Sequence, residues 1–287
     1  MKEVKCDLCG ENKPIKINCA PQYTNGQEIH ICSNCGLVYV VKRRNPQEIA
    51  KAWSDELYGS KYTGLSPLMR GRHSYIAAYL DQEFGLKGKS LLDVGAGEGN
   101  FLRICKDDYQ ANVYGVEPSD SNCKLLNELE IKSFSGTIEE FHAKNESGTR
   151  NTFDFVTLQW TLENCSEPNN ILKICRDFLK PNGVLLVATG SRILVPFKSV
   201  LNFYFSHNPV DTHPLRFSKS TLEAFFVKHG FKPQFNSYFN DGILLCSGIK
   251  QKKPNNSFDT PCDSPQKVAK FFEEWNDYTK RFTELFL

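Results

Sequence analysis

Two pairs of cysteines near the amino terminus have the spacing of a metal site. Each pair has two residues between its cysteines and is followed directly by glycine; the four residues are Cys6, Cys9, Cys32 and Cys35. Two intervening residues let both thiolates of a pair reach one tetrahedral Zn²⁺. Four thiolates fill the coordination shell and leave no position for water, so we predict a structural zinc ion rather than a catalytic one. A redox site would instead use a single C-x-x-C pair beside a βαβ unit.

A second pattern predicts a ligand site built largely from backbone. An apolar run with the features of a buried strand ends near Asp93 and leads into Gly95-x-Gly97-x-Gly99, after which the apolar residues have helical spacing. Glycines at such a turn allow positive φ and let a ligand approach where a Cβ would block it. The next predicted strand ends in Glu117, and an acid there can accept hydrogen bonds from two ribose hydroxyls.

Two ligand classes use this layout of strand, turn and helix. Dinucleotide sites space their glycines G-x-G-x-x-G, so that a helix N-terminus meets a pyrophosphate. Here the third glycine comes one residue early, and Asn100 occupies the position where that pattern has Gly or Ala. Asp93, just before the turn, suits an amino or sulfonium group better than a phosphate. We therefore expect a ligand without phosphates, although the glycines alone leave open an ordinary turn in another α/β protein.

The elements that must position these residues alternate along the chain. Strands are predicted at 90–94, 112–117, 131–135, 153–158 and 184–189, and helices at 100–109, 119–129, 138–144 and 168–179. Alternation of this kind predicts a parallel sheet flanked by helices. Ser220 and Glu223 have the spacing of a capping box for one further helix. Two closing strands follow, at 233–238 and 242–249, and predict a terminal antiparallel pair.

Two other segments carry apolar side chains whose role the sequence leaves open. Residues 190–217 are long for a connection and rich in aromatic residues, which is typical of a lid or binding loop. A helix packed on the core and a membrane-surface patch are the alternatives. Residues 264–287 predict a helix with an apolar stripe. We interpret that stripe as core packing or as the face of a homodimer.

Composition excludes several classes of protein. The chain has 287 residues, 40% of them hydrophobic, and a formal net charge of +2. No apolar run approaches the ~20 residues that span a bilayer, and the first residues lack a signal-peptide core. We therefore expect a cytoplasmic protein, in which eleven cysteines are not disulfides. The balanced charge argues against a nucleic-acid partner.

Several motifs together resemble those of one enzyme family. They are Cys32-Ser-Asn-Cys-Gly-Leu-Val-Tyr39, Leu91-Leu-Asp-Val-Gly-Ala-Gly-Glu-Gly99, Gly115-Val-Glu-Pro-Ser119, Gly136-Thr-Ile-Glu-Glu-Phe141, Phe153-Asp-Phe-Val156, Leu162-Glu-Asn-Cys165, Leu179-Lys-Pro-Asn-Gly183 and His213-Pro-Leu-Arg-Phe-Ser218. Over roughly residues 5 to 250 the chain resembles class I S-adenosylmethionine (SAM) methyltransferases with an N-terminal zinc-binding segment. Many relatives of that type act on activated sugars or on polysaccharide and natural-product precursors. The chain departs from the family pattern at Asn164 and Arg216, each of which replaces a histidine.

The resemblance implies a fold and a set of cofactor contacts. The expected fold is α/β, a Rossmann-like methyltransferase sheet with a terminal antiparallel strand and a small zinc ribbon. Its expected units are a ribbon (1–45), a connector with helices (46–89), a SAM-binding core (90–250, with the insertion 190–217), and a linker with the last helix (251–287). The residues expected to bind SAM are Asp93, Gly95, Gly97, Gly99, Glu117, Pro118, Thr137, Ile138, Gln159 and Trp160.

We therefore predict SAM-dependent methyl transfer to a small hydroxylated metabolite, with a nucleotide-linked sugar or polysaccharide precursor as the acceptor class that the resemblance implies. Positioning carries much of such catalysis, and an alcohol acceptor gains from a general base. His213 is the first candidate, since an imidazole with a pKa of ~6.5 takes a proton near neutral pH, and Glu163 is the second. Two other hypotheses are an RNA methyltransferase, because zinc ribbons also precede rRNA-modifying domains, and a SAM-binding scaffold without catalysis.

Overall fold

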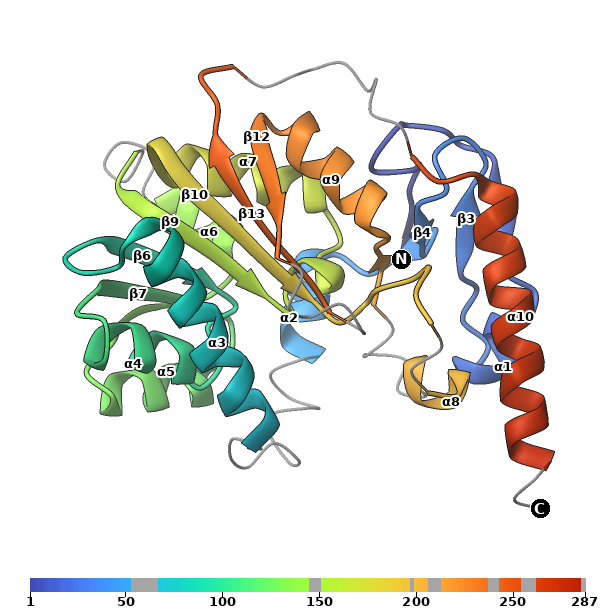
Figure 1. The fold of residues 1–287 in the computed structure, drawn as a ribbon, viewed down its shortest axis with the longest axis horizontal. Coiled ribbons are helices and arrows are strands. Elements are labelled where there is room, and N and C mark those ends of the chain that lie inside the picture. The colour runs from blue at the N-terminus through green and yellow to red at the C-terminus, as the bar shows by residue number, and fades with distance from the viewer. Residues whose placement is uncertain are drawn as a thin grey trace.

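A seven-stranded sheet forms the centre of the molecule (Figure 1). The computed structural model describes residues 1–52, 67–144, 151–196, 199–205, 213–236, 243–253 and 262–284. In chain order the strands of this sheet are β6 (Ser90–Val94), β7 (Asn112–Glu117), β8 (Lys132–Ser135), β9 (Phe153–Gln159), β10 (Leu179–Thr189), β12 (Phe231–Phe235) and β13 (Leu244–Lys250). Their order across the sheet is β12-β13-β10-β9-β6-β7-β8.

The directions of the strands confirm the predicted fold class. The pairs from β8 across to β10 are parallel, whereas β13 is antiparallel both to β10 and to β12. The sheet is therefore a mixed, Rossmann-like sheet. Strand β13 lies inside it, between β10 and β12, and β12 and β8 are its two edge strands.

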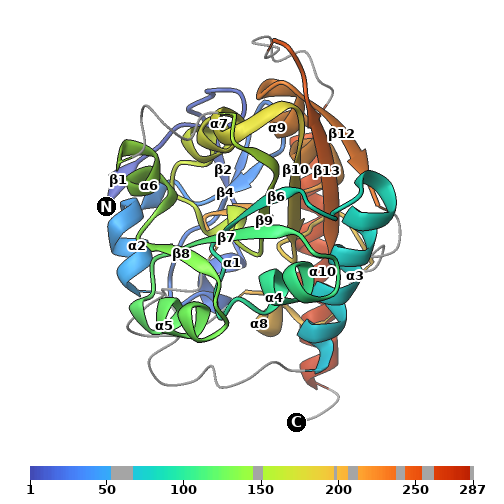
Figure 2. The ribbon, with the colours of Figure 1, turned by 90° about the vertical axis from the view of Figure 1, so that its left-hand side faces the viewer.

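Alternating side chains of each buried strand meet different helices. Leu91 packs with α3 (Pro67–Phe84) and α4 (Asn100–Asp107), and Leu92 packs with α6 (Ile138–Lys144) and α7 (Pro168–Phe178). This follows from the two-residue period of a strand, which sends successive side chains to opposite faces. Figure 2 shows α3, α4 and α5 (Asp120–Glu128) on one side of the sheet and α6 and α7 on the other. Both faces are buried, as a parallel sheet requires.

Two boundaries differ from the predictions for local reasons. Strand β10 begins at Leu179, ahead of the predicted strand at 184–189, and its pairing with β9 shifts register between Leu179 and Val184. The helix α9 (Lys219–Lys228) is capped by Ser218, whose hydroxyl accepts a hydrogen bond from the Thr221 amide at 3.0 Å. The prediction of a cap at Ser220 was therefore wrong, because Ser220 already lies inside the first turn.

The amino-terminal segment forms a small separate sheet. It contains β1 (Lys2–Glu3), β2 (Pro14–Lys16), α1 (Ala20–Tyr23), β3 (His30–Cys32), β4 (Val38–Tyr39), β5 (Lys42–Arg43) and α2 (Pro46–Ala52). Strands β2, β3 and β4 pair in a four-stranded sheet whose remaining strand is β11 (Leu215–Arg216). The insertion thus supplies an edge strand to the cysteine-bearing segment, and we call this unit, residues 1–43 with β11, the cysteine module.

The last helix, α10 (Pro265–Glu284), packs along this module, as Figure 1 shows on the right. Its apolar stripe, including Phe272 and Trp275, is buried against Ile31, Val38 and the short helix α8 (Leu201–Tyr204). The stripe is therefore core packing within the chain. Tyr278 and Phe282 remain exposed at about two fifths of their surface, and a homodimer through this helix stays a prediction. No helix in the described ranges is apolar over a length sufficient to cross a bilayer.

Candidate functional site

The glycine turn after β6 borders a cavity at the carboxyl ends of the parallel strands. Gly95 and Gly97 have φ angles of +74° and +53°, a region that favours glycine. A Cβ on Gly95 would lie 2.6 Å from Oγ1 of Thr161, so the turn leaves no room for one. Gly99 serves packing instead, because its Cβ would lie 2.5 Å from a methyl group of Leu126 and the residue does not line the cavity.

Glu117 holds the turn in place from the end of β7. Its carboxylate accepts hydrogen bonds from the backbone N–H groups of Gly97 and Ser119, each at 2.9 Å, and from Nδ2 of Asn122 at 3.4 Å. The side chain is 3% exposed, and burial raises the pKa of its carboxyl group above the ordinary value. A buried acceptor is therefore fixed at the position where the sequence predicted a ribose contact.

Asp93 lies at the floor of the same cavity, near the end of β6. Thr157 donates a hydrogen bond from its hydroxyl to Oδ1 of Asp93 at 2.5 Å. Burial raises the pKa of Asp93 to about 7, although the hydrogen bond from Thr157 and the nearby Gln159 side chain oppose that shift. A cationic group placed beside it would favour the carboxylate form. Both polar atoms of the Gln159 amide are buried without a hydrogen-bond partner among the described residues, which leaves them free for a ligand.

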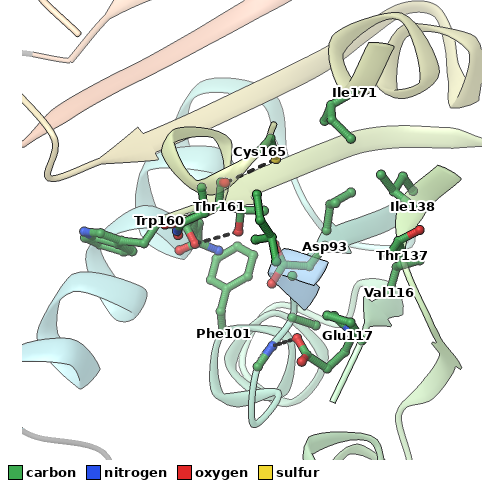
Figure 3. A pocket seen from close by; sticks show the side chains of 18 of the residues that line it. Asp93, Phe101, Val116, Glu117, Thr137, Ile138, Trp160, Thr161, Cys165 and Ile171 are labelled. Atoms are coloured by element: carbon green, nitrogen blue, oxygen red, sulfur yellow. Dashed lines mark hydrogen bonds between the residues drawn. The ribbon is translucent and has the colours of Figure 1, made fainter. Parts of the chain in front are cut away.

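The cavity has a volume of about 690 Å³, within the range of small-molecule pockets. Every residue predicted to bind SAM lines it except Gly99. Figure 3 shows how far it extends, with Thr137 and Ile138 at one end and Trp160 at the other. The carboxyl ends of β6, β7 and β9 thus bring together residues that are up to 67 positions apart, from Asp93 to Trp160.

The two residues predicted as bases occupy different environments. His213 lines the cavity, and its Nδ1 is in hydrogen-bond contact with Oγ of Ser191, while Nε2 makes no hydrogen bond with any described residue. Burial and the charge of Arg216 lower the pKa of His213 to about 3, so the ring is neutral at pH 7. Glu163 is fully buried beside Thr189 and does not line the cavity, and burial raises its pKa to about 7.

Comparisons with known proteins identify the family of this chain. A family model described as a methyltransferase domain matches residues 68–234. The chain belongs to this methyltransferase domain family. Two curated relatives named ubiquinone biosynthesis O-methyltransferase are similar: one from Pasteurella multocida is 34% identical over 167 residues, and one from Haemophilus ducreyi is 29% identical over 229 residues.

These matches cover different shares of the proteins. The Pasteurella multocida match covers 54% of this chain and 66% of the relative, and the Haemophilus ducreyi match covers 72% and 94%. The chain thus spans a little under two thirds of the first relative's length. Among solved structures, a Burkholderia thailandensis 1,6-didemethyltoxoflavin N1-methyltransferase has a TM-score of 0.54 at 14% identity and covers 75% of this chain and 96% of its own. That likeness shows the fold.

Sequence reasoning missed the part of the methyltransferase cavity that the helices supply. Met69, Arg72 and His73 of α3 line it, as do Pro46 and Ile49 of α2. The Arg72 guanidinium lies 5.4 Å from the centre of the Trp160 ring and pairs with no acidic side chain in the described ranges. Burial lowers the pKa of His73 to about 4, and its Nδ1 is buried without a partner among the same residues.

The four predicted metal ligands converge in the cysteine module. Sγ of Cys6 lies 3.5 Å from Sγ of Cys35, Sγ of Cys9 lies 3.4 Å from Sγ of Cys32, and all four sulfurs are within 4.8 Å of one another. Tetrahedral Zn–S bonds of ~2.3 Å place sulfurs about 3.8 Å apart. Contact with the Cys32 sulfur and burial raise the pKa values of Cys6 and Cys35, so a cation would be needed to hold all four as thiolates. The donor set fits Zn²⁺.

Proposed function

We propose that this protein is a SAM-dependent methyltransferase that methylates an oxygen of a small hydroxylated acceptor. The observation that carries the proposal is the pair of buried carboxylates, Asp93 and Glu117, on either side of a glycine turn in one cavity. The family match and the O-methyltransferase names of the relatives support the reaction class.

The residues of the cavity fit SAM, which supplies a methyl group activated by its sulfonium centre. Glu117 would accept hydrogen bonds from the ribose hydroxyls, and Thr137 and Ile138 would border the adenine. Asp93 and the unpartnered Gln159 amide would bind the methionine ammonium group. Arg72, which has no acidic partner in the described ranges, would bind the methionine carboxylate. These contacts would fix the position of the methyl group, and such positioning carries much of the catalysis.

Part of the cavity wall is apolar. It includes Pro46, Ile49, Met69 and the Trp160 ring, and Arg72 is the one permanently positive side chain among the described lining residues. This wall favours an acceptor with an apolar or aromatic face over the diphosphate of a nucleotide-linked sugar. His213 also lines the cavity, but a pKa of about 3 makes its ring a weak base, so we propose that its Nε2 accepts a hydrogen bond from the acceptor hydroxyl and orients it.

Binding and turnover can be measured separately. By calorimetry, SAM or its product S-adenosylhomocysteine (SAH) should bind and NAD should not; binding of NAD alone would refute the proposal. Radiolabelled SAM should then methylate a member of a panel of phenols, alcohols and nucleotide-linked sugars. Transfer to RNA instead would favour an RNA methyltransferase, and SAM binding without transfer would favour a non-catalytic scaffold.

We also propose that Cys6, Cys9, Cys32 and Cys35 bind one structural Zn²⁺. Metal analysis should find one zinc per chain, because the closed set of four thiols leaves no open position. Cys6→Ser should lower the stability of the cysteine module while the core still binds SAH. A metal-free preparation with an unchanged melting curve would exclude this site.

A further inference from the structure

A single buried arginine joins the first cysteine pair to the wall of the cavity. Asp7 lies between Cys6 and Cys9, and its Oδ2 accepts a hydrogen bond from Nη2 of Arg43 at 2.7 Å. The side chains of Arg43 and Asp7 are only 2% and 11% exposed. Because both side chains are buried, loss of either partner would leave the other as an uncompensated buried charge. The pair is therefore held in a fixed geometry.

The same guanidinium reaches the other side of the interface. Nη1 of Arg43 donates to the carbonyl oxygen of Ser166 at 2.9 Å, and Nε donates to the carbonyl oxygen of Val40 at 2.7 Å. Ser166 lines the cavity and follows the short 3-10 helix η2 (Leu162–Asn164). Arg43 therefore bonds the cysteine module and the segment after β9 at once.

Other contacts hold the same cysteine loop against α7 and α9. Nδ2 of Asn169 donates to the Asp7 carbonyl oxygen at 2.7 Å. Nζ of Lys228 donates to that oxygen at 2.7 Å and to the Leu8 carbonyl oxygen at 3.0 Å. The loop thus presents the Asp7 carbonyl group to α7 and α9, the Leu8 carbonyl group to α9, and the Asp7 carboxylate to Arg43. Its shape depends on the two cysteines that flank it, Cys6 and Cys9.

The segment held in this way is part of the cofactor site. Thr161 contacts the glycine turn, since a Cβ on Gly95 would meet its hydroxyl, and Asn164 donates from Nδ2 to the Trp160 carbonyl oxygen at 2.8 Å. Thr161, Asn164, Cys165 and Ser166 all line the cavity. A shift of this segment would therefore change the shape of the site for the methionine half of SAM.

We propose that Arg43 is a positioning residue that couples metal binding in the cysteine module to ligand binding in the cavity. Metal ligation fixes the Cys6–Cys9 loop, the loop fixes Asp7, and Arg43 transmits that position to Ser166. Loss of the metal allows the loop to move, so residues 161–166 are no longer held in place through the contact between Arg43 and Ser166. By linkage, metal and SAH then strengthen each other's binding by the same factor. This inference rests on the proposed zinc site.

The experiment uses the full chain and SAH as the probe. Arg43→Gln and Asp7→Asn each remove the buried ion pair, and Arg176→Gln is the matched control. Arg176 likewise donates to backbone carbonyls, those of Gly230 and Gln251, and lies 5.8 Å from an aromatic ring, but it does not line the cavity. Zinc content, the SAH Kd by calorimetry and hydrogen exchange of residues 161–172 are measured for each protein.

We expect zinc removal from the wild type to raise the SAH Kd about fivefold or more, the lower end of typical coupling. Zinc-loaded Arg43→Gln and Asp7→Asn should show a similar increase and faster exchange at 161–172, while Arg176→Gln matches the wild type. The double variant should bind SAH no more weakly than the weaker of the two single variants, because both substitutions remove the same ion pair between Arg43 and Asp7. Zinc removal should not raise the SAH Kd of Arg43→Gln further. If Arg43→Gln does not fold, Asp7→Asn, which keeps the side-chain shape, gives the same comparison.

The outcomes separate the two proposals. A wild-type chain that binds no zinc overturns the metal site and the coupling together. A chain that binds zinc but has the same SAH Kd with and without it overturns the coupling and leaves the metal site intact. Equal weakening by Arg43→Gln and Arg176→Gln would also overturn it, since the effect would then be a general loss of stability.

Discussion

Replacement of Glu117 by glutamine tests the ribose contact that we propose for this carboxylate. The carboxylate accepts two backbone hydrogen bonds at 2.9 Å, from Gly97 and Ser119, at 3% exposure. Glutamine keeps the shape but leaves one acceptor oxygen and places an NH₂ group against a donor. Losing a hydrogen bond to a charged group costs about 1.5–3 kcal/mol. The SAH Kd should therefore rise about 10- to 140-fold, at 1.4 kcal/mol for each factor of ten.

Isothermal titration with SAH measures this change, and Glu98→Gln is the control. Glu98 lies on the same turn and lines the cavity, but its carboxylate accepts a hydrogen bond only from Nδ2 of Asn100, at 3.0 Å, among the described residues. Its replacement should change the SAH Kd by no more than about twofold, which is well below the change expected from losing one hydrogen bond to a charged group. If Glu117→Gln leaves the affinity unchanged while the melting temperature is also unchanged, Glu117 does not contact the ligand and the orientation we propose is refuted.

Three further predictions concern residues around the cavity. Gly99→Ala should lower stability by about 1–3 kcal/mol through overpacking against Leu126, yet leave the SAH Kd unchanged; calorimetry and thermal unfolding distinguish the two. The pKa of Glu163 is raised from 4.5 to about 7, so its contribution to stability is lost as pH rises through that range. The free energy of unfolding of Glu163→Gln should therefore rise by up to about 3 kcal/mol relative to that of the wild type between pH 5 and pH 8. Denaturant unfolding at both pH values measures this, and an equal difference at the two would contradict it. The lowered pKa of His213 should keep its ring neutral down to about pH 4, which NMR titration of the histidine resonances can check, and a midpoint near 6.5 would refute it.

The core of the fold was predictable because its signals are local. Leu91 and Leu92 are both apolar, as expected for a strand buried on both faces, and each meets a different layer of helices. The pairing of β11 with β4 was not predictable, because it joins Leu215 to Tyr39 through only two residue pairs. Nothing in a two-residue strand marks its partner. Likewise, the stripe on α10 indicated burial, while its partners Ile31 and Val38 lie more than 200 residues earlier.

The part of the cavity at the carboxyl ends of the strands was predictable for a related reason. Asp93, Glu117 and Gln159 stand at or near the carboxyl ends of neighbouring parallel strands, and such ends meet at one edge of the sheet. Arg72 has no comparable signal, since its position depends on how α3 is rotated against the sheet. Gly99 shows the opposite difficulty. Its residue type fits the ligand turn, but its positive φ serves helix packing against Leu126.

The residues that line the cavity come from different parts of the chain, and this division bears on acceptor choice. The family match spans residues 68–234, which include Asp93 and Glu117. Pro46 and Ile49 lie outside that range, in the helix that directly follows the cysteine module. His213 lies within it but stands beside Pro214, whose carbonyl oxygen accepts a hydrogen bond from the Val40 amide of that module at 2.9 Å. Under the proposed function, the family domain would supply the SAM contacts, whereas the cysteine module would help to position the lining residues Pro46, Ile49 and His213. Acceptor specificity should then vary with residues 1–52 more than with the glycine turn.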